Sequence, residues 1–322
     1  MSLRLAIVVL NYRTAALTAD CLASIAPERE PGMAVVVVDN DSADGSAEAL
    51  ERWIAEHGHG DWMRVLRADR NGGFAAGNNL GIAAVAATNY VLLNSDARLL
   101  PGALRALQDA AERAPRAGLI GPRMLDEHGA WTASHFRCHN PVHELIRAAN
   151  TGPITRLLRH WDTPLPDTDQ PTTADWLGFA CVLIRSSTLR DVGPLDEGYF
   201  LYFEDADFCR RARACGWSSL HWPASTVVHL QGRSSGITGD ANRRRRPPRY
   251  YYASRARYFR RSYGRLGIPL ANLMWYLGFL VACVRMLCGR PPTHRIGEAV
   301  DLWTPAADAP RSAPRSAPRS TP

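Results

Sequence analysis

Three carboxylates lie within four positions of the segment "YFLYFEDADFCRRARACGW" at residues 199–217. They are Glu204, Asp205 and Asp207. Aromatic residues precede them, and burial beside rings and a second acid raises a carboxyl pKa toward neutral pH. A carboxylate with such a pKa suits general-base catalysis. The alternative is an acidic helix start that favours the macrodipole, with Asp207 paired to Arg210 or Arg211 one turn further on.

Two more acidic positions follow a run of valines in "VVVVDNDSADGS". Asp39 and Asp41 stand just past this run. A carboxylate there can accept hydrogen bonds from a nucleotide base or from ribose hydroxyls. The alternative is a turn that caps a helix, because Asp and Ser also favour turns.

The segment "LLNSDA" places Asn94 two residues before Asp96, at the end of another apolar run. Alternate side chains of an extended segment point the same way, so these two residues can share one divalent ion. Mg²⁺ or Mn²⁺ takes such oxygen ligands together with phosphate oxygens. The alternative is an Asx-turn that leads to Pro101.

A pair of glycines follows Asn71 in "RNGGFAAGNN". Gly72 and Gly73 allow the backbone to approach a ligand closely, with amides directed at phosphate. The spacing matches neither the dinucleotide-binding pattern nor the P-loop, and a plain turn is the alternative.

Short apolar runs alternate with helical patterns along the first part of the chain. Strands are predicted at 4–10, 34–39, 63–68, 90–94, 117–122, 176–185 and 225–230, and helices after Thr14, Asp41, Gly73 and Pro101 and over 203–216. Residues 125–175 are irregular. This alternation predicts a doubly wound α/β sheet. Ligands of such sheets bind at the carboxyl ends of the strands, where the polar residues described above stand.

The length and composition fit a globular protein. The chain has 322 residues, 46% of them hydrophobic, which indicates one large domain or a domain with an appendage. Its seven cysteines form no CxxC pair, which favours reduced thiols in a cytosolic compartment. The opening "MSLRLAIVVLNYRT" is too short in its apolar part for a secretion signal and predicts a first strand.

Positive charge is concentrated toward the carboxyl end. Residues 1–239 hold 22 basic and 27 acidic side chains, whereas residues 240–295 hold 13 arginines and one acid. A basic patch of this kind indicates an anionic partner such as nucleic acid, a membrane surface or a diphosphate.

Two consecutive segments make up this basic region. In "RRRRPPRYYYASRARYFRRSYGR" (243–265) arginines alternate with aromatic rings, as in RNA-stacking surfaces or lipid headgroup layers. The next, "IPLANLMWYLGFLVACVRML" (268–287), carries one charge, Arg285, which can snorkel. A helix of that length reaches roughly 30 Å, the hydrocarbon thickness. We therefore expect 240–295 to be a membrane-associating helical region, spanning or re-entrant, and the Pro/Arg/Ser tail at 296–322 to be disordered.

Seven segments occur in the order found in family 2 glycosyltransferases. They are "VVLNYRT", "VVVVDNDSADGS", "NGGFAAGNN", "LLNSDARL", "GFACVLIR", "YFLYFEDADFCRRARACGW" and "VVHLQGRSS". Over about residues 4–235 the chain resembles the rhamnosyltransferase-like branch of that family. The resemblance implies one GT-A domain at 1–239, an α/β fold with a doubly wound mixed sheet and helices on both faces.

The resemblance also implies roles on the donor side. Asp39, with Asp41 nearby, corresponds to the nucleotide-binding aspartate, and the loop Asn71, Gly72 and Gly73 lies beside the donor. Asn94, Ser95 and Asp96 take the place of the Asp-x-Asp metal motif, with Asn in the first position. The resemblance places His229 on the same Mg²⁺ or Mn²⁺ ion as Asp96, whereas a histidine that ends an apolar strand is otherwise a structural residue.

On the acceptor side the resemblance makes Asp205 the base that takes the proton of the attacking hydroxyl. Glu204 is its neighbour and orients the acceptor. Trp176, just before "LGFACVL", can stack on the acceptor sugar, with core packing as the alternative.

The function implied is an inverting, metal-dependent glycosyltransferase. The donor is a dTDP- or UDP-sugar, with dTDP-rhamnose favoured, and the acceptor is a polyprenyl-diphosphate-linked or other cell-envelope glycan at the cytoplasmic face of the membrane. Two alternatives stay open. One is a catalytically silent subunit that binds sugar nucleotides or membrane, with Asn94 as a sign of decay, and the other is an RNA-binding protein, which the apolar segment disfavours.

Overall fold

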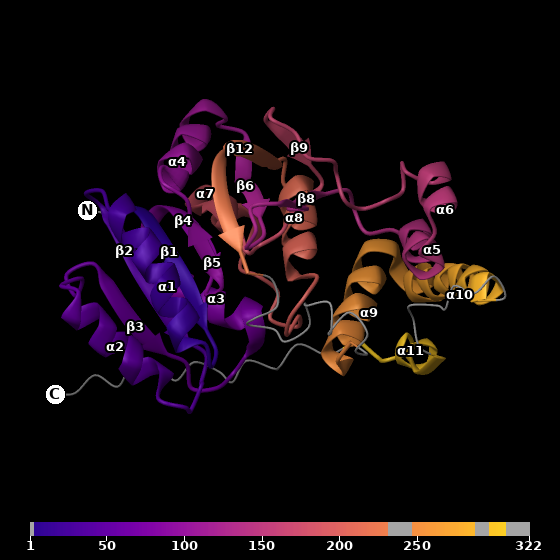
Figure 1. The fold of residues 1–322 in the computed structure, drawn as a ribbon, viewed down its shortest axis with the longest axis horizontal. Coiled ribbons are helices and arrows are strands. Elements are labelled where there is room, and N and C mark those ends of the chain that lie inside the picture. The colour runs from indigo at the N-terminus through magenta and orange to yellow at the C-terminus, as the bar shows by residue number, and fades with distance from the viewer. Residues whose placement is uncertain (1–2, 231–246, 287–295, 307–322) are drawn as a thin grey trace.

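The computed structural model describes residues 3–230, 247–286 and 296–306. A mixed sheet of ten strands forms its main body (Figure 1). The strands are β1 (Leu3–Asn11), β2 (Met33–Asp39), β3 (Met63–Arg67), β4 (Ala87–Asn94), β5 (Ala97–Leu99), β6 (Ala117–Leu125), β7 (Trp131–Thr132), β9 (Thr172–Ala174), β11 (Cys181–Arg185) and β12 (Ser218–His229). The main path runs β3-β2-β1-β4-β11-β6-β12-β5, with β7 on β6 and β9 on β12. Strands β1 to β4 are parallel, and β11 runs antiparallel to both of its neighbours.

Helices cover both faces of this sheet, as the alternating pattern predicts. One face carries α1 (Ala15–Ile25), α2 (Ser46–Glu56) and α4 (Ala103–Arg113), and the other carries α3 (Gly73–Ala83), α7 (Ser186–Val192) and α8 (Glu204–Ala214). Leu5, Ile7 and Val9 of β1 pack into the first core, whereas Val8 packs into the second. Successive side chains of a strand point to opposite faces, so a continuous apolar strand supplies both cores.

Several predicted elements differ in detail. The helix predicted after Pro101 begins at Ala103, because Gly102, with φ +82°, is the N-cap; Pro101, expected in the first turn of this helix, lies before it. The strand predicted at 176–185 is divided into β10 (Trp176–Leu177), which pairs with β8 (His135–Phe136), and β11. The irregular stretch contains two helices, α5 (Pro141–Ala149) and α6 (Gly152–Leu157). Asn140 caps α5 by accepting the His143 amide, which is a favoured N-cap arrangement.

A group of helices lies beside the sheet (Figure 1). It consists of α5, α9 (Arg249–Tyr263), α10 (Gly267–Met286) and α11 (Ile296–Asp301). Because α11 and the buried Leu302 belong to this group, the expectation of disorder from residue 296 is wrong for 296–302. The Pro/Arg/Ser repeat itself lies outside the described residues.

Ion pairs and a hydrogen bond, made around the buried Glu144 and Arg255, join the four helices. Glu144 of α5 accepts from Arg147 at 3.0 Å and from Arg255 of α9 at 3.2 Å. Arg147 reaches Glu298 of α11 at 3.3 Å, and Arg255 donates to Asn272 of α10 at 2.8 Å. Burial alone would raise the pKa of Glu144, but the two arginines hold it below its ordinary value.

Removing this carboxylate should destabilise the fold. We expect Glu144→Ala to lower the free energy of unfolding by about 3–5 kcal/mol, because Arg255 would stay buried without its partner. A depressed carboxyl pKa contributes stability above the unfolded value and loses it as pH falls. Urea unfolding at pH 7 and at pH 3, which lies below the unfolded pKa of about 4.3, measures both effects. A cost below 1 kcal/mol at pH 7, with the same cost at pH 3, would contradict this role.

The same packing bears on the RNA-binding alternative. Tyr252, Arg255 and Tyr258 of the Arg/Tyr run are each 1% exposed, so they are not available to stack on bases. Arg285 does not snorkel: it donates to the carbonyls of Ala149 and Asn150 at the carboxyl end of α5, where a cation is favourable. One helical stretch in the described residues, Arg249–Arg285, is long and apolar enough to cross a membrane, although 33% of its apolar window is buried.

Candidate active site

The carboxyl ends of three parallel strands meet at one edge of the sheet. Asn11 at the end of β1 is in register with Asp39 at the end of β2, and Leu10 is in register with Asn94 at the end of β4. The sequence prediction that Asp39 and Asn94 belong to one edge is therefore confirmed.

Asp39 is held by its neighbours in a fixed orientation. Its Oδ1 accepts from Asn11 Nδ2 at 2.6 Å and from Ser42 Oγ at 2.5 Å, and its Oδ2 accepts from the Ser42 amide at 3.1 Å. Asn11 is fully buried, and its own oxygen accepts from Thr18 at 2.8 Å. Asp39 and the exposed Asp41 line a cavity of about 440 Å³. This cavity has the carboxylates that the nucleotide-binding prediction requires.

The glycine loop of Asn71, Gly72 and Gly73 makes hydrogen bonds within the protein. Asn71 Oδ1 accepts from the Gly73 amide at 3.0 Å and from Asn40 Nδ2 at 2.9 Å. The next amide, that of Phe74, donates to the Phe200 carbonyl at 2.7 Å. Of the two amides predicted to point at phosphate, that of Gly73 is thus engaged within the protein. The loop positions the backbone of the acidic segment.

Gly73 is required where this contact is made. Its φ is +81°, and a Cβ there would lie 2.0 Å from the Phe200 oxygen. We expect Gly73→Ala to displace the acidic segment and to lower kcat/KM by about 10²-fold, since a shift of about 1 Å near the chemistry can cost that much. Gly102→Ala is the matched control, because Gly102 has φ +82° and no neighbouring atom within 4 Å. Equal kinetic effects of the two changes would show that backbone strain, not the Phe200 contact, is responsible.

The acidic segment enters α8 through an unusual backbone. Tyr202 and Phe203 have φ of +71° and +68°, a left-handed conformation that costs non-glycine residues energy and often occurs at active sites. The turn places Glu204 and Asp205 at the first positions of α8, in the wall of a cavity of about 260 Å³.

Both carboxyl groups have raised pKa values. Burial raises the pKa of Asp205 to about 6, against the opposing hydrogen bond from the Ala206 amide. Burial, followed by the charge of Asp205, raises the pKa of Glu204 well above its ordinary range. Glu204 is 4% exposed, and its Oε2 has no hydrogen-bond partner within the described part of the chain. A buried acceptor in a cavity wall, without a protein partner, fits a ligand hydroxyl.

Asp207 takes no part in this cavity. Its side chain is fully buried and pairs with Arg210 at 2.8 Å and with Arg211 at 2.9 Å. Arg261 of α9 lies 3.5 Å away. The helix-pair alternative is therefore confirmed for this acid alone.

Asp96, in the turn between β4 and β5, lies close to His229 at the end of β12. Asp96 Oδ1 lies 3.2 Å from His229 Nε2, and Asn94 Nδ2 lies 3.5 Å from the same nitrogen. Neighbouring ligands of an octahedral ion with bonds near 2.1 Å are about 3.0 Å apart, so this pair fits Mg²⁺ or Mn²⁺. No group of three or more His, Cys, Asp or Glu side chains within the described ranges could hold a metal. The remaining ligands would have to come from substrate, water or Asn94.

One cavity is lined by five of the predicted site residues. They are Asn94, Trp176, Glu204, Asp205 and His229, and the cavity has a volume of about 260 Å³. Asp96 Oδ1 lies 3.2 Å from His229 Nε2. Trp176 is 8% exposed, stacks on Phe136 with ring centroids 4.0 Å apart, and donates to the Arg137 carbonyl. It is therefore packed in the core, yet part of it forms the cavity wall.

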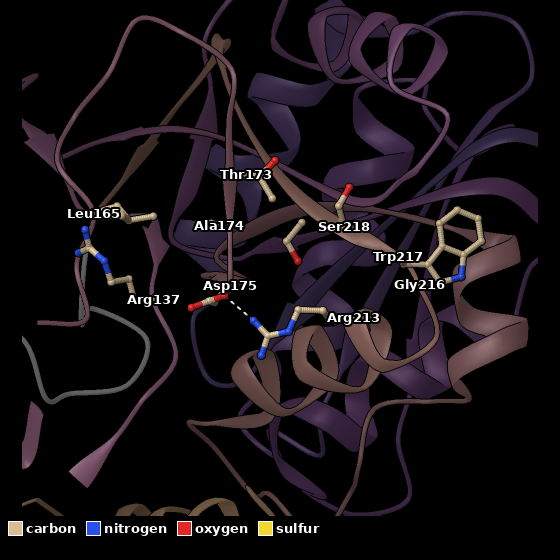
Figure 2. Close-up of a pocket in the computed structure, with 10 residues that line it drawn as sticks. Arg137, Leu165, Thr173, Ala174, Asp175, Arg213, Gly216, Trp217 and Ser218 are labelled. Carbon is tan, nitrogen blue, oxygen red and sulfur yellow. Dashed lines mark hydrogen bonds and ion pairs between the residues drawn. The ribbon is translucent and has the colours of Figure 1, made fainter. Parts of the chain in front are cut away.

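Another cavity, of about 470 Å³, lies at the opposite end of α8 (Figure 2). An ion pair between Asp175 and Arg213 crosses it, and Trp217 and Ser218 stand at its edge. None of the predicted site residues is among the described residues that line it.

Some residues that build the site carried no predicted role. Asn11 and Ser42 orient Asp39, Asn40 fixes the glycine loop, and Tyr202 and Phe203 turn the acids toward the cavity. Asn11 lies in the segment "VVLNYRT", but the side chains that it contacts, Asp39 and Ser42, are 28 and 31 residues away. Only the folded chain reveals such contacts.

Comparisons with known proteins agree with this geometry. The sequence model described as "Glycosyl transferase family 2" matches residues 6–186. The N-acetylglucosaminyl-diphospho-decaprenol L-rhamnosyltransferase of Mycobacterium tuberculosis is 31% identical over 234 residues, which cover 67% of this chain and 72% of that protein.

Solved structures share the fold. The mannosyltransferase PcManGT from Pyrobaculum calidifontis, in complex with GDP-Man and Mn²⁺, has a TM-score of 0.57 at 13% identity and covers 93% of this chain and 78% of its own. GalNAc-T7 with UDP, GalNAc and Mn²⁺ has a TM-score of 0.55 at 14% identity, over 90% of this chain and 58% of its own.

Proposed function

The chain belongs to glycosyl transferase family 2, and from this premise we propose that it transfers a sugar from a nucleotide donor to a lipid-linked glycan with inversion at the anomeric carbon. It is a glycosyltransferase with a GT-A-type fold and resembles rhamnosyltransferases. We propose dTDP-rhamnose as the donor and a polyprenyl-diphosphate-linked sugar as the acceptor, because the mycobacterial relative is a rhamnosyltransferase named for a decaprenyl diphosphate acceptor.

The observation that carries this proposal is the shared cavity. Asp205, with a pKa raised to about 6, faces the same space as Asn94 and His229. Single displacement needs a base on one side of the anomeric carbon and a site for the departing diphosphate on the other. This cavity brings together side chains suited to both tasks.

The donor would occupy two neighbouring spaces. Its base and ribose would lie in the cavity of Asp39 and Asp41, where the fixed Asp39 carboxylate can accept their hydrogen bonds. Its sugar would enter the cavity of Asn94 and His229. A Mg²⁺ or Mn²⁺ ion held by Asp96 and His229 would supply charge that neutralises the leaving diphosphate.

The acceptor would approach from the opposite side. Asp205 accepts the proton of the attacking hydroxyl as the new glycosidic bond forms and the bond to the diphosphate breaks. Glu204, whose Oε2 is buried without a protein partner among the described residues, would bind a second acceptor hydroxyl. The edge of Trp176 would limit the acceptor sugar to one orientation.

The domain assignment follows from these roles. We propose that residues 1–239 form the catalytic domain and that 240–295 hold it at the cytoplasmic face of the membrane. The net positive charge of the basic region would favour binding both to anionic lipid and to the diphosphate of the acceptor.

A transfer assay tests the proposed function. The full chain in detergent is incubated with a polyprenyl-diphosphate N-acetylglucosamine acceptor and with dTDP-rhamnose or UDP-sugars, with Mn²⁺, Mg²⁺ or EDTA. We expect metal-dependent transfer of rhamnose. Failure of every donor to react, while the folded chain still binds nucleotide, would favour a catalytically silent subunit.

A further inference from the structure

One side of α10 presents a continuous apolar stripe to solvent. The stripe runs from the residue before the helix to its last turn, with exposed fractions of 45–65%. It consists of Leu266, Leu270, Leu273, Leu277, Leu280 and Val284. Their spacing of three and four residues places them along one helix face. A contiguous apolar surface of this kind is rare on soluble monomers and marks an interaction site.

The opposite side of α10 is bound to the protein. Asn272 and Trp275 are fully buried, and Asn272 bonds to Arg255 and to the Leu302 carbonyl. Gly278 packs so closely on α5 that a Cβ there would lie 2.3 Å from the Leu145 oxygen. One face of α10 is therefore committed to the helix group, and the stripe on its other face is free to meet a partner.

This attachment disfavours a membrane-spanning helix. If α10 crossed the bilayer, the buried ion pairs of Glu144, Arg147 and Arg255 would enter the hydrocarbon with it, where charged groups are costly. The adjoining α5 has nine residues and would be about 14 Å long, too short to cross beside α10.

We propose that α10 lies in the plane of the membrane surface and inserts the stripe Leu266–Val284 into one leaflet that carries anionic headgroups. Charge argues for this partner, since residues 240–295 hold 13 arginines and one acid and the exposed Arg260 and Arg265 stand next to the start of the stripe. Exposed Tyr263 adds a ring suited to the headgroup layer. A second copy of the chain would bring its own arginines against these, so like charges would meet.

If the chain has the proposed function, the position of α10 also affects how the acceptor reaches the active site. An in-plane α10 fixes the distance of the catalytic domain from the leaflet, as a lipid-linked acceptor requires. Membrane attachment depends on the stripe and on the basic residues beside it, not on catalysis. It can be measured without any sugar transfer, so the two proposals fail separately.

Flotation with vesicles tests the partner. The full chain is mixed with vesicles of phosphatidylcholine alone or of phosphatidylcholine with about 30% phosphatidylglycerol. The second mixture has roughly the negative surface charge of a cell membrane. We expect binding to the anionic vesicles, and Leu273→Glu with Leu277→Glu to lower the partition coefficient by about 100-fold, because each buried leucine contributes about tenfold or more. Leu80→Glu is the matched control, since Leu80 is 37% exposed on α3. All variants change exposed residues, and their melting temperatures verify folding.

Two outcomes of this assay overturn the proposal. One is binding of the double variant equal to that of the unmodified chain. The other is a dimer, seen by light scattering without vesicles, that the double variant dissociates while neither protein floats.

Depth measurement separates the in-plane from the spanning arrangement. An environment-sensitive fluorescent amino acid is placed in turn at positions 266, 273 and 280, and lipids with quenchers at known depths locate each one. The in-plane helix predicts the same shallow depth at all three. A spanning helix predicts depths that differ by up to about 20 Å over these 14 residues, which would contradict the proposal.

Discussion

Replacing Asp205 with asparagine lowers kcat for sugar transfer by about 10²–10⁴-fold, the usual contribution of a positioned base. The amide keeps the shape of the side chain but cannot take the acceptor proton. Donor affinity should stay within about twofold, because Asp39, Asp41, Asp96 and His229 are unchanged. Steady-state kinetics with donor and acceptor varied separately measure both effects. Glu204→Gln should instead raise the acceptor KM more than it lowers kcat, and the same kinetic pattern in the two variants would contradict the assigned roles.

The raised pKa of Asp205 predicts how both activity and stability change with pH. Activity requires the ionised form, so kcat/KM should rise with pH through about 6 and then level off. The unfolded carboxyl ionises near pH 3.9, so stability falls as pH rises between that value and the folded pKa. Asparagine removes the cost of ionising this half-buried carboxyl, so the variant should be more stable at pH 7.5 by about 1–2 kcal/mol. This gain is smaller than the free energy that corresponds to the whole pKa shift, because the side chain is partly exposed.

Replacing Asp96 with asparagine is the second large expected effect. One charge at the Asp96–His229 pair is lost, so the concentration of Mn²⁺ for half-maximal activity should rise at least about tenfold. The kcat/KM at limiting metal should fall by about 10²–10³-fold, since charge stabilisation by a metal is worth several kcal/mol. Calorimetric titration of Mn²⁺ in the presence of nucleoside diphosphate gives a readout independent of turnover.

Asp61→Asn is the control for the change of charge. Asp61 pairs with Arg29 on the exposed surface, so its replacement should leave the Mn²⁺ dependence unaltered. Full activity of the unmodified enzyme in EDTA, or an Asp96→Asn variant with unaltered Mn²⁺ dependence, would contradict the metal-binding role.

The sequence was most informative where local pattern decides structure. Valine-rich runs predicted the parallel strands, because a strand buried on both faces needs apolar side chains throughout. The acids and amides just beyond those runs were therefore expected to meet at one edge of the sheet. The strand register confirms this, because Asn11 pairs with Asp39 and Leu10 pairs with Asn94. The helix over 203–216 ended as predicted, with Gly216 at φ +86°.

The sequence was least informative where partners lie far apart along the chain. The left-handed turn at Tyr202 and Phe203 contains no glycine that would have predicted it. It is stabilised by the packing of the Phe200 backbone on Gly73, more than a hundred residues earlier in the chain. The Gly73 amide donates to Asn71 Oδ1, and the Phe74 amide donates to the Phe200 carbonyl. Arg285 caps α5 instead of snorkelling because α5, in the stretch that showed no pattern, folds into a helix beside it.

The account depends most on the position of the acceptor hydroxyl between Asp205 and the diphosphate site. The direct measurement is an experimental structure of the Asp205→Asn variant with donor, Mn²⁺ and acceptor. We predict that the side-chain oxygen at position 205 lies about 2.6–3.2 Å from the attacking hydroxyl, with the diphosphate beside Asp96 and His229 on the far side of the anomeric carbon. An acceptor hydroxyl directed away from position 205, or a diphosphate bound elsewhere than at Asp96 and His229, would contradict the account.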